Sequence, residues 1–416
     1  MRLGEIRHQE RLPAGRPLDG VRVLSVEQMQ ALPYATQLMA HLGADVVKVE
    51  TPKTGDAGRV SQPSLEDVDG RRVGATYLRN NLSKQSLAID LKHPDGRALF
   101  ERLVPRFDVV AENLRPGAMR ALGLGPEAIA KLSPRTVTVS ISGFGSGGES
   151  PYASWPSYAP VAEAMSGLYE PNRKEGQPPP VVVAGALGDV GTALFAVIGT
   201  LAALRHRERT GLGQHVDLAM FDAMIAISDM PAHLWSMGAP ERWAASGSLG
   251  VCAGFRARDG HFVVAVFREH QFQRLAQAVG HPEWSQDPRF ATREGWALHT
   301  DSVIRPALEH WARDKSKLEA SRELCAAGIV AGPSNTAADL SQDPHVALRD
   351  MLIEVPRTDA ERPFLVVGNP VKLSRVAEGP VRRFPSLGQH TDATLREDLG
   401  LSEPEIAALR TSGAIG

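Results

Sequence analysis

Short apolar runs alternate with helix-like stretches along the first half of the chain. The runs 21–26 (VRVLSV) and 45–50 (DVVKVE) have the length and β-branched content of buried strands, and a helical pattern between them opens at Pro33 and ends near Gly43. The alternation continues through strands expected at QSLAIDL, DVVAENL, TVTVSIS and QHVDLAM. Strands that alternate with helices form parallel sheets, so residues 18–230 are predicted to fold as one doubly wound α/β domain.

The pattern changes after residue 230. Residues 231–332 combine a predicted strand pair, FRARDGHFVVAVF, with helical stretches, which indicates a smaller α+β domain. The turn of this pair is expected at Asp259 and Gly260. Residues 333–416 are loop-rich and end in two polar helices, whose domain the periodicity does not reveal. Residues 1–17 are expected to be a disordered lead.

The amino-acid composition narrows the classes of function that the protein can have. The most apolar stretch, from Val190 to Leu204, is shorter than the roughly 18–20 residues that span a bilayer, so it is interpreted as a buried helix. The 46 basic and 48 acidic residues leave a formal net charge of −2, which argues against a protein that binds nucleic acid or a membrane surface. The two cysteines, Cys252 and Cys325, fit a reducing, cytoplasmic setting, and no metal site is predicted.

A glycine-rich segment, GFGSGG at Gly143–Gly148, follows a predicted strand and matches the spacing of a dinucleotide-binding loop. The next segment, ESPYASWPSYAP, contains three prolines and cannot form the helix that such a loop requires. Binding of NAD or FAD is therefore rejected. Two interpretations stay open: a flexible loop, or a mobile loop that covers a site at the carboxyl end of the strand.

Four other residues are candidates for chemistry. Asp189 opens the longest apolar helix, either as its N-cap or as a carboxylate in a glycine-lined niche within reach of a substrate carbonyl. Lys84 and Arg115 lie near the ends of predicted strands, where they are either phosphate ligands or solvated surface charges. Gln30 follows the first strand and is either a buried amide or a group that contacts a ligand.

The combination of motifs resembles the class III coenzyme A transferases, the CaiB/BaiF family that includes formyl-CoA transferase and carnitine CoA-transferase. The matching segments are LGADVVKVE, LAIDLKHPDGRALF, ENLRPGAMRALGLG, SISGFGSGG, AMSGL, GALGDVGTALFAVIGTLAAL and ERTGLGQHVDLAMFDA. The resemblance implies a small domain inserted late in the chain, a return of residues 333–416 to the large domain, and an interlocked homodimer. It also implies coenzyme A thioesters as substrates, with no tightly bound cofactor.

Within this resemblance, Asp189 matches the nucleophilic aspartate of the family. The residues that match coenzyme A contacts are Gln30, Ala31, Asn81, Leu82, Ser83, Lys84, Asn113, Leu114, Arg115, Arg120, Ser142, Gly143, Phe144 and Gly145. The chain departs from the family at Thr51, where a basic residue is common, and at Leu32, where glycine is common. The segment closest to the family's covering loop is SGSLG at 246–250.

The implied activity is transfer of coenzyme A from an acyl-CoA donor to a small carboxylic acid, through an aspartyl anhydride and an aspartyl-CoA thioester. The related α-methylacyl-CoA racemases pair the aspartate with a histidine, and this chain has Tyr158 in that segment, which favours transfer. A racemase-like enzyme, an intramolecular CoA-migrating enzyme and a non-catalytic acyl-CoA-binding protein are the alternatives. The sequence does not specify the donor or the acceptor.

Overall fold

The computed structural model describes residues 1–147, 150–170, 173–174, 176–181, 185–228, 231–238 and 250–416. The chain divides into two compact units. The larger unit comprises Met1–Ser166, Val181–Ser228 and Pro344–Gly416, and the smaller one comprises Gly167–Pro180 and Asp229–Asp343. The chain therefore leaves the larger unit twice, at Gly167 and at Asp229, and its C-terminal segment from Pro344 returns to that unit.

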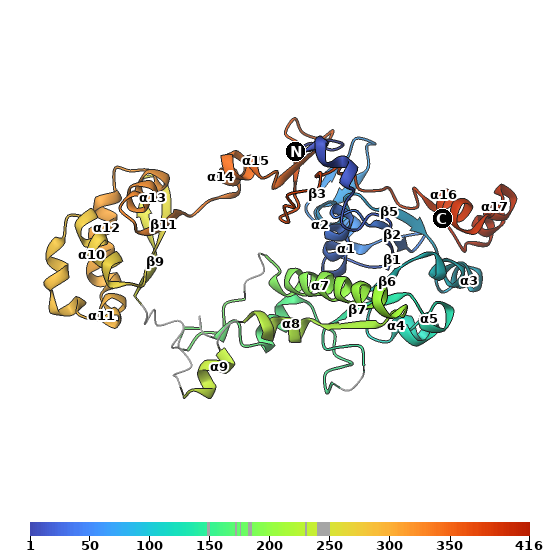
Figure 1. Ribbon diagram of the computed structural model, residues 1–416, viewed down its shortest axis with the longest axis horizontal. Coiled ribbons are helices and arrows are strands. Elements are labelled where there is room, and N and C mark those ends of the chain that lie inside the picture. Colours follow the sequence, from blue (N-terminus) through green and yellow to red (C-terminus); the bar gives the residue numbers. More distant parts are fainter. Residues whose placement is uncertain (148–149, 171–172, 175, 182–184, 229–230, 239–249) are drawn as a thin grey trace. The chain divides into compact units, whose positions relative to one another are not determined.

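A parallel sheet of six strands forms the centre of the larger unit (Figure 1). In spatial order the strands are β5 (Gln85–Ala88), β2 (Asp45–Glu50), β1 (Arg22–Val26), β6 (Val109–Glu112), β7 (Val137–Ser142) and β8 (His215–Ala219). Neighbouring strands are parallel throughout. Numbered along the chain within this sheet, the order is 3-2-1-4-5-6, which is that of a doubly wound fold. The predicted fold class is confirmed.

The central strands are covered on both faces. All six residues of β7 are buried, as are five of the six in β2, so both faces of these strands are covered. β1 pairs with β2 on one side and with β6 on the other, so the order of winding reverses between β1 and β6. In sheets of this kind, ligands bind beyond the carboxyl ends of the strands at that switch point.

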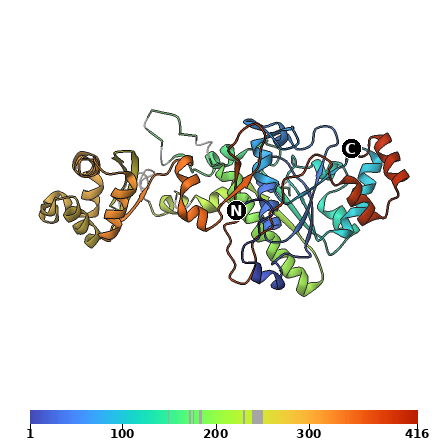
Figure 2. The same ribbon diagram turned by 90° about the horizontal axis from the view of Figure 1, so that it is seen from above.

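Helices pack on both faces of the sheet, as Figure 1 shows. One face carries α1 (Ala31–His41), α6 (Ala159–Met165), α7 (Leu187–Thr210) and α8 (Met220–Ile227). The other face carries α3 (Pro94–Leu103), α4 (Ala118–Ala121), α5 (Pro126–Leu132), α16 (Thr391–Leu399) and α17 (Glu403–Ser412). Figure 2 shows the last two, in red, beside the cyan helices of that face. The end of the chain thus completes the core of the larger unit.

Helix α7 extends beyond both ends of the apolar stretch Val190–Leu204 that the sequence predicts to be a buried helix. It is long and apolar enough to cross a membrane by length and composition, but half of its most apolar window is buried within the protein, as in a core helix. Its buried face includes Ala193 and Ala196, which belong to the same apolar cluster as the residues of α1. The large apolar side chains exposed on its outer face are Leu187, Leu194, Ile198 and Leu201.

The N-terminal segment is ordered, contrary to the expectation for residues 1–17. Arg2 and Arg7 form β-bridges with Glu354 and Glu378, and the Arg7 guanidinium pairs with Asp350 at 3.1 Å. These contacts hold the segment against the end of the chain, a long-range pairing that local sequence cannot reveal. The shorter elements of the larger unit are η1 (Gln9–Ala14), η2 (Ala57–Val60), β3 (Ser64–Glu66), β4 (Arg72–Gly74), α2 (Ala75–Asn80), η3 (Val104–Arg106), α15 (Pro344–Leu348), β12 (Leu352–Val355) and β13 (Phe364–Val367).

The smaller unit has an antiparallel sheet of three strands in the order β11-β10-β9. The predicted strand pair is present, but Ala257 pairs with Gly260, so the turn residues are Arg258 and Asp259 rather than Asp259 and Gly260. Its elements are α9 (Pro231–Ser236), β9 (Val251–Ala257), β10 (Gly260–Val266), α10 (Glu269–Ala278), η5 (Pro282–Gln286), η6 (Pro288–Phe290), α11 (Arg293–Leu298), η7 (Thr300–Ile304), α12 (Arg305–Ala312), α13 (Lys317–Ala326), β11 (Val330–Pro333) and α14 (Ala337–Gln342).

Candidate active site

The loops after β1 and β6 are tied together at the switch point of the sheet. The Asn113 side chain accepts a hydrogen bond from the Gln28 N–H at 2.8 Å and donates one to the Gln28 carbonyl at 3.0 Å. Both ends of the Asn113 amide are therefore engaged by the backbone of the other loop. Asn113 was predicted as a coenzyme A contact, and in this arrangement its side chain fixes the shape of the site.

The other predicted residues of these loops differ in burial and in whether their side chains have partners. Gln30 is the N-cap of α1, half-buried, and its side-chain amide has no hydrogen bond to the described residues. Ala31 is buried and follows it in the first turn. Arg115 is exposed and pairs with no acidic group in the described part of the chain. Gln30 and Arg115 are therefore available to a ligand at this edge of the sheet.

A cleft of about 390 Å³ opens at the same edge. Val49 and Ile89 contribute apolar surface, and Leu114, a predicted contact, lines it as well. Lys53 and Lys92 stand at its rim, both exposed and without an acidic partner among the described residues. Apolar walls with free cations suit a ligand that joins an aromatic base to phosphates. Neither lysine was predicted from the sequence, although Lys53 lies only two residues after Thr51.

The segment Asn81–Lys84 is fully buried, unlike the loops just described. The Lys84 ammonium donates to Glu27 Oε1 at 2.6 Å, to the Pro33 carbonyl at 2.8 Å and to Asn81 Oδ1 at 3.1 Å. An ammonium group has three donors, and these contacts occupy all of them. The phosphate contact predicted for Lys84 does not fit this arrangement, because no donor is left for a ligand.

Lys84 belongs to a buried charge network formed by Glu27, Lys48, Asp56, Asn81 and Lys84. Lys48 pairs with Asp56 at 2.5 Å and donates to Asn81 at 3.0 Å. Burial alone would raise the pKa of Asp56, but the charge and hydrogen bond of Lys48 hold that pKa below its usual value. Burial lowers the pKa of Lys84 to about 8, against the opposing effect of Glu27. The network is a structural feature beneath the site.

The described part of the glycine-rich loop is anchored. Phe144 is buried in an aromatic cluster whose other members are Tyr152, Trp155 and Phe221. The Ser146 N–H donates to the Asp217 carboxylate at 3.0 Å, and the Gly143 carbonyl accepts from the Phe221 N–H at 3.1 Å. Gly145 adopts φ +90°, a conformation that favours glycine. These contacts hold residues 143–146 against β8 and α8, while Gly148 lies outside the described residues.

Three further predicted features have mixed outcomes. The Ser142 hydroxyl is buried at the carboxyl end of β7 and has no hydrogen-bond partner in the described structure. Arg120 lies on the surface, where it pairs with Glu127 at 2.5 Å, so its charge is already engaged. Residues 246–249 of the segment suggested as a covering loop lie outside the described residues.

Asp189 is the third residue of α7 and does not cap it. The N-cap position is Ala186, which has φ 39° and no side-chain acceptor. Glu163, from α6, supplies the missing acceptor, because its Oε1 takes the Gly188 N–H at 2.7 Å. The Asp189 carboxylate accepts no hydrogen bond and forms no ion pair within the described residues. The N-cap interpretation is therefore wrong, and this half-buried carboxylate is free to react.

The electrostatic surroundings of Asp189 increase its basicity. Burial is the main cause that raises the pKa of Asp189 to about 6, the Glu163 carboxylate acts in the same direction, and the Arg79 guanidinium opposes both. Perturbed carboxylates in a cleft are typical of catalytic sites. Neither Glu163 nor Arg79 was predicted from the sequence, although Glu163 is the single acidic residue in the helix APVAEAM.

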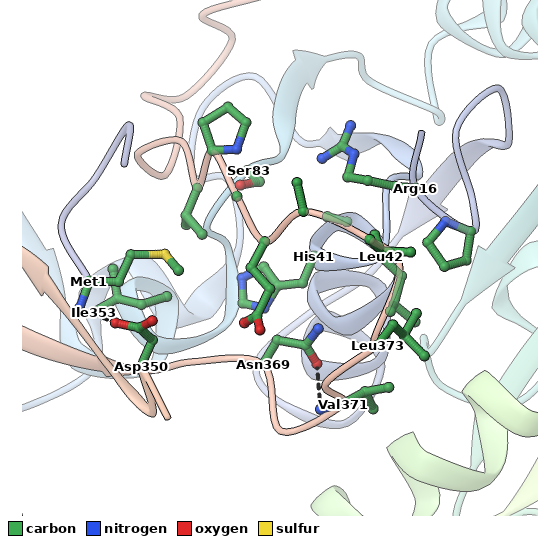
Figure 3. A pocket seen from close by; sticks show the side chains of 18 residues that line it. Met1, Arg16, His41, Leu42, Ser83, Asp350, Ile353, Asn369, Val371 and Leu373 are labelled. Carbon is green, nitrogen blue, oxygen red and sulfur yellow. Dashed lines mark hydrogen bonds and ion pairs between the residues drawn. The ribbon is translucent and has the colours of Figure 1, made fainter. Parts of the chain in front are cut away.

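A second cavity, of about 30 Å³, lies at the other end of α1 (Figure 3). His41, the last residue of α1, is drawn with Asp350 and Asn369 around this cavity. Both ring nitrogens of His41 are buried without a hydrogen-bond partner in the described structure, and burial lowers its pKa to about 4. A helix of 11 residues is about 16 Å long, so this cavity is separate from the N-terminal end of α1 where Gln30 lies.

The model of CoA-transferase family III matches residues 18–391 of the chain. The chain belongs to this family. Coenzyme A transfer is the activity of its named relatives, and the protein is a class III CoA-transferase. Coenzyme A thioesters are accordingly the substrates of the family.

The similarity to individual members extends over nearly the whole length. The chain is 35% identical to the succinyl-CoA:mesaconate CoA-transferase of Haloarcula hispanica, over 91% of this chain and 96% of that one. It is 31% identical to the formyl-CoA:oxalate CoA-transferase of Rhodopseudomonas palustris, over 96% and 97% of the two chains. A CaiB/BaiF family protein from Brucella suis has a similar structure, with a TM-score of 0.80 and 32% identity over 92% of this chain and 99% of that one.

Proposed function

We propose that this class III CoA-transferase moves coenzyme A from an acyl-CoA donor to a small carboxylic acid through covalent intermediates on Asp189. The observation that carries the proposal is the state of the Asp189 carboxylate, which is half-buried, unpaired among the described residues and of raised pKa. A nucleophile needs an unshared electron pair that no strong donor already holds. Asp189 meets this condition because Glu163 occupies the neighbouring helix N–H in its place.

The proposed reaction exchanges bonds without consuming a proton. The Asp189 carboxylate attacks the thioester carbonyl of the donor, the C–S bond breaks, and coenzyme A leaves as a thiolate with a mixed anhydride on Asp189. The thiolate then attacks the Asp189 carbonyl carbon, which releases the donor acid and forms an aspartyl-CoA thioester. The acceptor carboxylate attacks this thioester and expels the thiolate. Attack of the thiolate on the acceptor acyl carbon gives the new thioester and restores Asp189.

The position of Asp189 on the helix suits these steps. Each addition places negative charge on an oxygen next to the first turn of α7, where N–H groups have no partner within the helix. The positive end of the helix dipole favours this charge. A well-placed N–H donor to such an oxyanion typically contributes a factor of about 10²–10³ in rate. The first turn of α7 can therefore stabilise the same intermediates that Asp189 forms.

The cleft with Lys53 and Lys92 is the proposed site for the nucleotide end of coenzyme A. Its apolar wall can hold the adenine, and the free cations of Lys53, Lys92 and Arg115 can pair with the phosphates. These lysines can supply the positive charge that Thr51 does not. Replacing Lys53 and Lys92 together by alanine should weaken coenzyme A binding measured by calorimetry, and unchanged affinity would place the nucleotide elsewhere.

The proposed partners are an acyl-CoA and a small carboxylic acid, with no nucleic acid, membrane or tightly bound cofactor, and the proposed setting is the cytoplasm. The dicarboxylic acids named for the relatives, mesaconate and oxalate, are the first acceptors to test. A homodimer is proposed as well, and the exposed apolar face of α7 around Leu194 and Ile198 supports an interface. Sedimentation of the purified chain as a monomer would contradict it.

Replacement of Asp189 by asparagine tests the central role directly. The amide has nearly the same shape and no anionic nucleophile, so transfer should fall by at least about 10³-fold. Coenzyme A affinity and the melting temperature should stay close to wild type, and Asp222→Asn, an exposed acid on α8, serves as the matched control. Transfer at the wild-type rate in Asp189→Asn would refute the assignment of Asp189 as the nucleophile.

A further inference from the structure

Arg79 is a half-buried cation that lacks an acidic partner. Its guanidinium carbon lies 4.9 Å from the centre of the Tyr34 ring, and its Nη1 donates to Asn80 Oδ1 at 2.8 Å. No carboxylate in the described part of the chain pairs with it. Buried arginines are normally paired, and a guanidinium has five N–H donors. Most N–H donors of the Arg79 guanidinium therefore have no hydrogen-bond partner among the described residues.

The guanidinium of Arg79 is held in place by its neighbours. Tyr34 is itself buried in the first turn of α1, so the ring beneath the cation is fixed. Asn80 is oriented by its own side-chain N–H bonds to the Thr76 carbonyl at 3.0 Å and the Met29 carbonyl at 3.3 Å. An arginine that is oriented before the ligand arrives loses little conformational entropy on binding, which favours tight recognition of an anion.

Arg79 and Asp189 are near each other without being in contact. α1 and α7 pack together, and Tyr34 and Ala193, one turn after Asp189, belong to one apolar cluster. Both helices begin at the carboxyl edge of the sheet, because each follows a strand in a right-handed crossover. No ion pair within 4.0 Å joins the two groups, yet the cation lowers the pKa of Asp189.

We propose that Arg79 binds the non-reacting carboxylate of a dicarboxylic substrate while the other carboxyl group reacts at Asp189. The planar guanidinium can donate two parallel hydrogen bonds to that carboxylate. A monocarboxylic acid offers Arg79 no partner, so the chain should prefer dicarboxylic acids and their CoA thioesters. This inference rests on the proposed function of Asp189 and adds to it the substrate class and the residue that selects it.

The charges of the site give a reason for this arrangement. A dicarboxylate brings a second negative charge toward Asp189 and Glu163, which are both acidic, and like charges in a half-buried site repel strongly. Among the described groups that act on Asp189, Arg79 is the cation that opposes this repulsion. Its removal should therefore weaken binding of dicarboxylic acids and leave monocarboxylic acids largely unaffected.

The test measures transfer to dicarboxylic acids and to monocarboxylic acids of matched length. Isotope exchange between labelled free acid and its own CoA thioester is followed for oxalate, succinate and mesaconate, and for acetate and butyrate. Wild type should favour succinate over butyrate. Arg79→Gln should reduce kcat/KM for the preferred dicarboxylate by about 10–100-fold, mainly through KM, and change that for butyrate by less than about twofold. Arg79→Lys should recover only part of the loss, because a lysine cannot form the planar pair.

Arg97→Gln is the matched control, since Arg97 is an exposed arginine on α3, on the other face of the sheet. It should leave both activities unchanged. A wild-type preference for monocarboxylic acids, or an equal loss for succinate and butyrate in Arg79→Gln, would overturn the role of Arg79 while the function at Asp189 stands. No transfer by wild type to any of these acids would overturn the proposed function itself, and with it this inference.

Discussion

Two groups of charges in the larger unit differ in how completely they are paired. In the buried charge network, Lys48 and Lys84 contact Glu27, Asp56 and Asn81 at hydrogen-bond distances, and all of these residues are buried. Around Asp189, by contrast, the carboxylate and the Arg79 guanidinium are half-buried and have no ionic partner among the described residues. The two groups contain similar residue types.

The difference separates structural charges from reactive ones. A buried ion whose donors are all satisfied cannot bind a ligand without first breaking its own contacts, and breaking them is unfavourable. A half-buried ion without a partner has a desolvation penalty that no contact compensates. The free energy of the site falls when a substrate supplies the missing charge. Residue type alone therefore does not identify a binding residue, and the completeness of its pairing does.

The largest expected effect concerns the paired group. Lys84→Met removes a cation from the buried charge network and leaves Glu27 buried without its 2.6 Å partner, so the free energy of unfolding should fall by about 3–5 kcal/mol. Arg79→Met, from the unpaired group, should lower it by about 1 kcal/mol or less. Urea unfolding of the two variants measures the difference. Equal losses would mean that pairing does not distinguish the two groups.

A second prediction concerns His41, a buried group with neither charge nor partner. Its pKa is about 4 in the folded chain and near 6.5 when unfolded, so between these values the unfolded state binds more protons. The free energy of unfolding should therefore decrease as pH falls from 6.5 toward 4, by up to roughly 3 kcal/mol. His41→Phe should reduce this dependence, whereas His8→Gln, at an exposed histidine, should not. An unchanged pH slope in His41→Phe would contradict the burial of a neutral ring.

The smallest effect is expected at Glu163, which accepts the Gly188 N–H at the start of α7 and whose charge raises the pKa of Asp189. Glu163→Gln keeps an acceptor for the Gly188 N–H but removes the negative charge that raises the pKa of Asp189. Since Asp189 must be deprotonated to attack, transfer is lost as pH falls through its pKa, and this acidic limb of the pH–rate profile should move to lower pH in Glu163→Gln. Glu208→Gln, at an exposed acid near the C-terminal end of α7, should not move the acidic limb. A limb that stays in place would show that Glu163 acts on structure alone.

The sequence predicted the fold more completely than the site. β-branched runs identified β1, β2 and β7 within one residue, because valine, isoleucine and threonine are enriched in strands. Asp189 could be singled out by its place before an apolar helix and by the family resemblance. Lys84 could not be assigned correctly, because its partner Glu27 is 57 residues away along the chain. Glu163 and Arg79 were missed for the same reason, since their importance depends on the contacts of α6 with α7 and of α2 with α1.

The most direct test of the account is the detection of a covalent intermediate on Asp189. Purified protein is mixed with an acyl-CoA substrate, quenched during turnover with hydroxylamine, digested and examined by mass spectrometry. An aspartyl-CoA thioester would be converted into a hydroxamate, so the peptide that carries Asp189 should gain this modification, and the same peptide from Asp189→Asn should not. Turnover with no modified peptide, or with the modification on another residue, would contradict the claim that Asp189 is the nucleophile.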